Sequence, residues 1–150
     1  MPSRLRGNLD TINFVPLWLN KSNTMKKTNK IIYWVATIWL CLGMTSTGIV
    51  QLIKMEEEVA NFSNLGYPTY LMTIIGTWKI LGVIALLIPK FPLLKEWAYA
   101  GFFFAMSGAI ISHLENSPTA TEIFGPALLL LLTLLSWYFR PASRKVAVTP

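Results

Sequence analysis

Charged residues are scarce in this chain of 150 residues. They make up 13% of it, whereas a soluble domain usually carries about 25%, and hydrophobic residues make up 53%. A chain with so little charge and so much apolar surface is poorly suited to a soluble fold. The composition therefore points to a protein of the lipid bilayer.

Cysteine and histidine are nearly absent, with Cys41 and His113 the single examples of each. One cysteine excludes an intramolecular disulfide and a C-x-x-C dithiol. One histidine excludes a bis-histidine haem or a His/Cys metal cluster within one chain, so no metal site is expected. The sequence also lacks a phosphate-binding glycine motif, H-E-x-x-H and a nucleophile elbow. These absences argue against a self-contained enzyme, and no cofactor motif is evident.

What the chain does have is long apolar runs, predicted as four spans at residues 31–53, 70–88, 97–114 and 123–139. Segments of about 17–25 residues cross a hydrocarbon core about 30 Å thick as helices. Backbone groups find no water in lipid, so each span should satisfy its own hydrogen bonds. Because the connections are short, we expect antiparallel neighbours. The predicted fold is all-α, an integral membrane four-helix up-down bundle.

The placement of basic residues predicts the orientation of the bundle. Six of the 13 precede the first span, two lie in the second connection and three follow the last span. In a four-span bundle all of these lie on one side, which the positive-inside rule assigns to the cytoplasm. We therefore expect both termini to be cytoplasmic (N-in/C-in) in a bacterial inner membrane. Topology explains the net charge of +6, so the lipid bilayer is the expected partner and nucleic acid is not.

Residues 1–25 differ from the rest of the chain, because they hold scattered polar residues without a clear period. We expect them to be disordered or an upstream extension, with translation starting at Met25. The alternative is a short amphipathic stretch, Phe14–Leu19, lying on the membrane surface. Residues 26–143 then form the membrane domain and 144–150 a tail. Within the domain, Lys54–Leu65 is predicted to form a short helix outside the membrane.

Two stripes of small residues are candidate helix-packing faces. Helices in lipid associate where small side chains let their backbones approach. The first stripe lies on the first span and the second on the third span: Thr37, Cys41, Thr45 and Gly48, then Gly101, Ala105, Gly108 and Ser112.

Lys79 is the one full charge inside a predicted span. A lysine at mid-membrane costs about 2.5–3.5 kcal/mol on insertion scales. Its side chain should tilt toward the N-terminal, outer end of its helix. One interpretation is a ligand or proton site in a polar outer cavity, and the other is a lysine that snorkels to water or caps carbonyl groups. Four further residues are candidates for the ligand site: Thr45, Gln51, His113 and Glu115.

Several motifs, in order and spacing, resemble the DoxX-like family of small four-helix bacterial membrane proteins, over about residues 26–143. They are Gly66-Tyr67-Pro68, the G-T-W-K-I-L-G run from Gly76, the L-K-E-W-A-Y-A-G-F block from Leu94, Ser112-His113-Leu114 and the S-W-Y-F-R-P end from Ser136. The family name comes from a subunit of a thiosulfate:quinone oxidoreductase, so the resemblance implies quinone chemistry for distant relatives. Most members have no established activity.

The sequence departs from the family pattern at two places. Many members carry an acidic residue near the end of the third span and Gly-Asp after the Ser-His-Leu, where this chain has Met106-Ser107 and Asn116-Ser117. A proton-handling role is therefore not carried over to these positions.

Three functions fit these patterns. The first is a redox-associated subunit that binds a quinone or another lipophilic ligand, with Lys79 and His113 hydrogen-bonding the polar head. The second is a small transporter or proton-pathway protein, for which no inverted repeat or broken helix is evident. The third is a non-catalytic scaffold that assembles with a partner membrane protein or with itself. Of these, binding of a hydrophobic small molecule is preferred.

Overall fold

The computed structural model describes residues 27–116 and 120–146. Within them the chain is helical and contains no strand. The elements in chain order are α1 (Lys27–Leu52), α2 (Glu56–Asn64), α3 (Tyr70–Leu87), α4 (Pro92–Glu115), α5 (Ala120–Tyr138) and the short 3₁₀ helix η1 (Ala142–Arg144).

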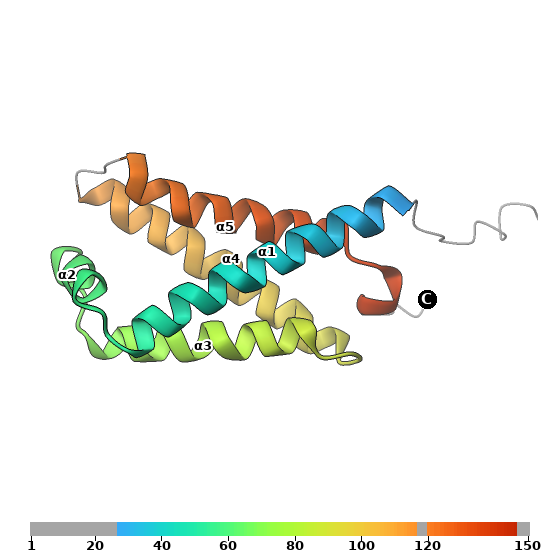
Figure 1. Ribbon diagram of the computed structural model, residues 1–150, viewed down its shortest axis with the longest axis horizontal. Helices are drawn as coiled ribbons and strands as arrows, with labels where there is room; N and C mark the ends of the chain where they lie inside the picture. The colour runs from blue at the N-terminus through green and yellow to red at the C-terminus, as the bar shows by residue number, and fades with distance from the viewer. Residues whose placement is uncertain (1–26, 117–119, 147–150) are drawn as a thin grey trace, which may run out of the picture.

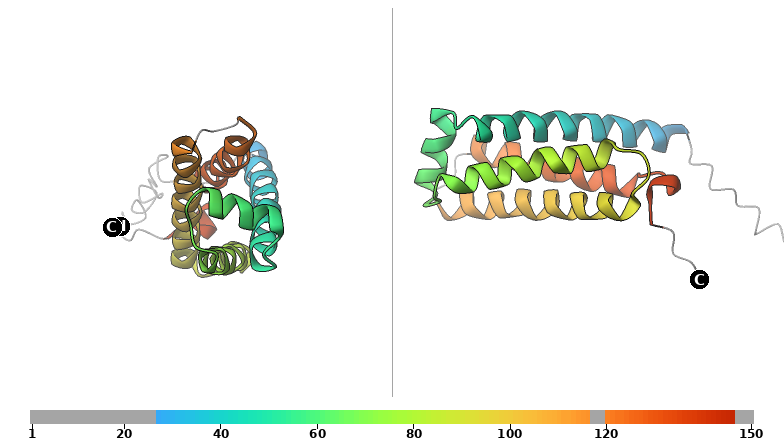
Figure 2. Two further views of the ribbon diagram at one scale, coloured as in Figure 1. Left: turned by 90° about the vertical axis from the view of Figure 1, so that its left-hand side faces the viewer. Right: turned by 90° about the horizontal axis from the view of Figure 1, so that it is seen from below.

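The four long helices lie side by side, and α2 lies across one end of them (Figures 1 and 2). α1 packs against α3 and α5, and α4 packs against the same two helices. The first and last described residues lie at the end opposite α2, as the blue and red ends of the chain show in Figure 1. We call the two ends the α2 end and the terminal end.

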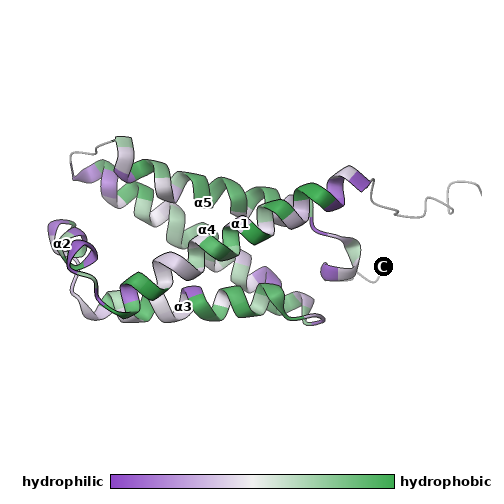
Figure 3. Ribbon diagram, viewed as in Figure 1, coloured by the Kyte–Doolittle hydropathy of each residue, from purple (hydrophilic) through white to green (hydrophobic). Residues whose placement is uncertain are grey.

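The four long helices are each long and apolar enough to cross a membrane. Their middle sections are hydrophobic around much of their surface, and the polar residues gather near the two ends and on α2 (Figure 3). Large side chains such as Trp39, Trp78 and Phe104 are 64–70% exposed. Such an apolar exterior suits contact with lipid, where exposing hydrophobic residues carries no cost.

The helix boundaries agree with the predicted spans within a few residues, except at α4. That helix begins at Pro92, so the connection predicted at residues 89–96 is shorter than expected. Lys95, which was expected in this connection, lies inside the helix. Proline suits this position because the first helical residue needs no N–H donor. The predicted short helix after the first span is confirmed as α2. The predicted extension 1–25 and residues 147–150 of the tail lie outside the described residues.

Helices α1 and α3 approach most closely at two glycines. A Cβ added to Gly76 would lie 2.9 Å from the carbonyl oxygen of Gly48, and one added to Gly48 would lie 3.3 Å from that of Gly76. Only glycine leaves room for such backbone contact. On the first small-residue stripe, Thr37, Cys41 and Gly48 are buried.

The second small-residue stripe, on α4, does not form the close helix contact that the sequence predicts. Gly101 and Gly108 are exposed, and a Cβ on either would meet no atom within 4 Å. Ala105 and Ser112 are half-buried. These small residues leave open space beside α4, and that space forms part of the two hollows described below.

Lys95 is the most deeply buried charge at the terminal end, with 1% of its surface exposed. Its Nζ donates to the carbonyl oxygens of Ala85 (2.9 Å), Leu86 (3.1 Å) and Ile88. The last carbonyl groups of a helix have no partner within the helix. Lys95 therefore closes the C-terminal end of α3 from the neighbouring helix.

A second polar link joins α4 to the end of α5. The Glu96 carboxylate accepts hydrogen bonds from the indole N–H of Trp137, at 3.0 Å, and from the guanidinium of Arg140. The Arg140 guanidinium also lies over the Tyr99 ring, 5.3 Å from its centroid. Deeper in the bundle, the Ser136 hydroxyl lies 2.7 Å from both the Tyr99 and the Thr37 hydroxyls. These bonds join α1, α4 and α5 at the terminal end.

Candidate functional site

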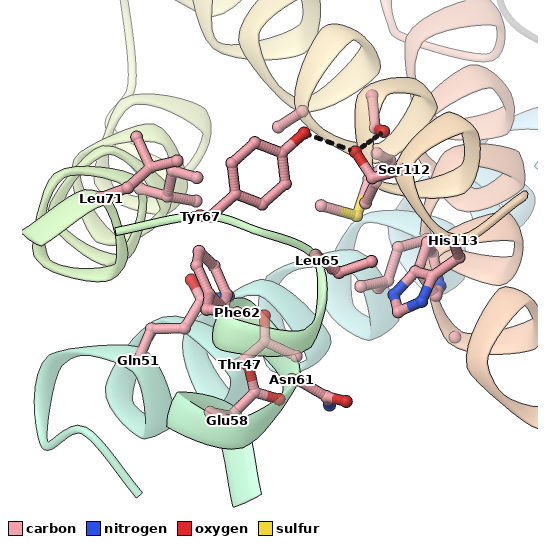
Figure 4. Close-up of a pocket in the computed structure, with 18 of the residues that line it drawn as sticks. Thr47, Gln51, Glu58, Asn61, Phe62, Leu65, Tyr67, Leu71, Ser112 and His113 are labelled. Carbon is pink, nitrogen blue, oxygen red and sulfur yellow. Dashed lines mark hydrogen bonds between the residues drawn. The ribbon is translucent and has the colours of Figure 1, made fainter. Parts of the chain in front are cut away.

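A hollow of about 520 Å³ at the α2 end is lined by residues of all five α-helices, and we call it the outer chamber (Figure 4). Most of its lining is apolar, and polar side chains enter it from every helix. These are Thr47 and Gln51 from α1, Glu58 and Asn61 from α2, Lys79 from α3, Ser112 and His113 from α4, and Glu122 from α5. Its size and mixed lining are typical of a small-molecule site.

Helix α2 forms the roof of the chamber. Its three consecutive glutamates occupy the first turn, where negative charge favours a helix N-terminus. Phe62 is buried beneath it, with its ring centroid 6.2 Å from that of Tyr67. The Tyr67 hydroxyl lies 2.7 Å from that of Ser112, and the Asn116 amide donates to the Asn64 carbonyl at 3.2 Å. The roof is thus tied to the end of α4.

Lys79 forms part of the chamber's inner wall, and only 5% of its surface is exposed. Its Nζ donates one hydrogen bond, to the Thr47 hydroxyl at 3.2 Å. An ammonium group has three N–H donors, so this bond leaves donor capacity for a molecule in the chamber. Glu58 contributes negative charge to the same chamber from α2. The buried cation therefore has a hydroxyl partner in direct contact and a carboxylate across the cavity.

Gln51 adds an unpaired acceptor to the lining of the same chamber. The residue is 7% exposed, and its Oε1 is buried without a hydrogen-bond partner. A buried polar atom left unpaired costs about 1–3 kcal/mol, so such atoms are uncommon unless something else binds them. The chamber lining thus includes the Lys79 ammonium, which can donate further hydrogen bonds, and the Gln51 Oε1 atom, which can accept one.

His113 and Glu122 form the side of the chamber nearest the α4–α5 connection. His113 Nδ1 lies 3.9 Å from a carboxylate oxygen of Glu122. Gly125 and Pro126 line the same side. A Cβ on Gly125 would meet no atom within 4 Å, so the glycine leaves the space in front of α5 open.

Residues 35–136 match the DoxX-like family model. The chain belongs to the DoxX-like family. No curated protein and no solved structure matches it. The family assignment and the four apolar helices together make this a multi-pass membrane protein.

In this DoxX-like protein three of the sequence candidates meet in the outer chamber: Lys79, Gln51 and His113. Thr45 is half-buried and Glu115 is exposed, and neither lines the chamber. The hydroxyl that reaches Lys79 belongs instead to Thr47, two residues further along α1. Two residues on a helix differ by about 200° in direction, so Thr45 and Thr47 point to different sides of α1.

Other lining residues of the DoxX-like protein were not identified from the sequence. Tyr67 and Asn61 enter the chamber only because α2 folds back over the helix ends. The sequence predicts a turn at Gly66-Tyr67-Pro68, but it does not predict the direction of the chain after this turn. Within residues 27–116 and 120–146, no group of three His, Cys, Asp or Glu side chains could hold a metal ion.

Proposed function

We propose that this DoxX-like protein is an up-down four-helix bundle in a bacterial inner membrane, with both termini in the cytoplasm, and that it binds a lipophilic molecule with a polar head. Quinone is the first candidate. The observation that carries the proposal is that Lys79 and the unpartnered Gln51 Oε1 both line a chamber whose surface is otherwise largely apolar. An apolar cavity with a few convergent polar groups is the usual form of a small-molecule site.

The chamber's hydrogen-bonding groups fit a ring that carries both oxygen acceptors and hydroxyl donors. The Lys79 ammonium would donate to a carbonyl oxygen of a quinone. The unpaired Gln51 Oε1 would accept from a hydroxyl, such as that of a quinol. A molecule that presents both groups would satisfy the two side chains together.

The test is a titration of a benzoquinone carrying a decyl chain into the full-length protein in lipid nanodiscs. The variants are Lys79→Met and, as a matched control, Lys30→Met, because Lys30 is exposed on α1 and lies outside the chamber. A hydrogen bond to a charged group contributes about 1.5–3 kcal/mol, so Lys79→Met should weaken binding about tenfold or more. The control should bind like the wild type.

Equal binding by all three proteins would exclude Lys79 as a ligand contact. No binding by the wild-type protein would reject the quinone proposal and favour a scaffold, whose partner would be a membrane protein or a second copy. The Lys79→Met protein should remain folded, because methionine is similar in length and removes the cost of burying a charge.

A further inference from the structure

A second hollow lies between α3 and α4, on the side of the bundle away from α1 and α5. It has a volume of about 350 Å³, and we call it the α3–α4 groove. Trp78 and Leu81 line it from α3, and Trp97 and Gly101 line it from α4. The two tryptophans are 69% and 66% exposed, so the groove opens toward the surroundings of the helices rather than into the core.

The groove and the outer chamber are neighbours. Ile75, Lys79 and Ala105 line both of them. Among the residues that line the groove, Lys79 is the one that carries a charge. The buried cation therefore lies between a chamber with several polar side chains and a groove lined almost entirely by apolar surface.

Two glycines explain why this groove is open along one part and closed along another. A Cβ on Gly82 would lie 2.6 Å from the Phe102 ring, so α3 and α4 are in contact there. A Cβ on Gly101 would meet no atom within 4 Å. Along α3 the groove extends from Ile75 to Ala85, which at 1.5 Å per residue is about 15 Å, or about half the hydrocarbon core.

We propose that the ligand is an amphiphile whose hydrocarbon tail lies in the α3–α4 groove while its polar head occupies the outer chamber at Lys79. This inference rests on the proposed binding function and adds the ligand's shape and its route. The junction at Lys79 joins a head site to a tail site, and the groove's exposed rim lets the molecule enter sideways from the bilayer. A ligand that consists of the polar head alone would occupy only the outer chamber.

The tail gains little free energy from the groove, because lipid is as apolar as the groove lining. Its importance is steric. A tail attached to a head in the chamber must leave through an opening, and the groove is the hollow that shares lining residues with the chamber. Filling the groove should therefore exclude tailed ligands and leave bare heads unaffected.

The test compares a tail-less benzoquinone with the same head carrying a decyl chain, each titrated into nanodisc-embedded protein. Gly101→Leu fills the groove from a position where a Cβ meets no atom within 4 Å. Ala100→Leu is the matched control, since Ala100 is exposed on the same helix and lines neither hollow. Gly101→Leu should weaken binding of the decyl compound about tenfold or more and leave the tail-less compound unchanged. The control should change neither.

The possible outcomes separate the two proposals. Tail-less binding with no effect of Gly101→Leu on the decyl compound would overturn the groove assignment and leave the head site standing. An equal effect of Ala100→Leu would also overturn it. Failure of both compounds to bind wild-type protein would reject the head site and the groove together.

A second measurement needs no variant. A decyl-chain benzoquinone with a diazirine at the chain end should photolabel wild-type α3 and α4 near Leu81 and Ala98, which both line the groove. Labelling confined to α1 or α5 would contradict the proposed tail position.

Discussion

At the scale of single residues, this protein buries two lysines in different ways. Lys95 is enclosed by three carbonyl oxygens at the end of α3, so its hydrogen-bonding capacity is used within the protein. Lys79 has one hydroxyl partner and lines a cavity. The first arrangement is structural, and the second leaves donor capacity for the ligand that we propose. The sequence singled out Lys79 because it interrupts an apolar run, but it gave no sign of Lys95, which was assigned to a connection.

Replacing Lys95 should therefore destabilise the protein without affecting ligand binding directly. Lys95→Met would leave the carbonyl oxygen of Ala85 without its buried donor, whereas that of Leu86 would keep its hydrogen bond from Arg144. The expected cost is about 2 kcal/mol in the free energy of unfolding. Denaturant unfolding in detergent micelles would measure this, with Lys30→Met as the control. A Lys95→Met protein as stable as the wild type would show that the carbonyls find other partners.

At the scale of the helices, the arrangement is set by close backbone contact on one side and by open space on another. Gly48 and Gly76 bring α1 and α3 together, whereas Gly101 and Gly108 line hollows. A stripe of small residues looks the same in sequence in both cases. Only the rotation of each helix about its axis decides whether it meets a neighbour, and a single sequence carries no direct record of that rotation.

The same substitution at two glycines should separate these roles. Gly76→Val places a side chain 2.9 Å from a backbone oxygen of α1 and should lower the free energy of unfolding by about 1–3 kcal/mol. Gly101→Val enters open space and should cost far less. Unfolding curves of the two variants in one detergent test this, and equal losses would disprove close packing at Gly76.

At the scale of the whole molecule, four apolar helices were predictable because length and hydropathy alone identify spans. The roof over the chamber was not, since α2 is short and its position depends on contacts such as Tyr67 with Ser112. The basic residues before the first span and after the last predict which end faces the cytoplasm, and the structure adds that the described chain ends lie together.

This orientation can be tested by labelling cysteines from one side of the membrane. Ser63 at the α2 end and Ser143 at the terminal end are both exposed, and the native Cys41 is buried. In spheroplasts, a membrane-impermeant maleimide should label Ser63→Cys at once and Ser143→Cys only after lysis. The reverse pattern would invert the orientation and place the chamber on the cytoplasmic side.

The measurement that tests the central claim most directly is mass spectrometry of the small molecules retained when the protein is extracted together with its native lipids. Gly108→Leu should be compared with the wild type, because it fills the outer chamber from a position where a Cβ meets no atom within 4 Å. Ala100→Leu serves as the control. We predict a lipophile with a polar head in the wild-type and control samples and its loss from Gly108→Leu. The same molecule retained equally by all three proteins would contradict a binding site in the outer chamber.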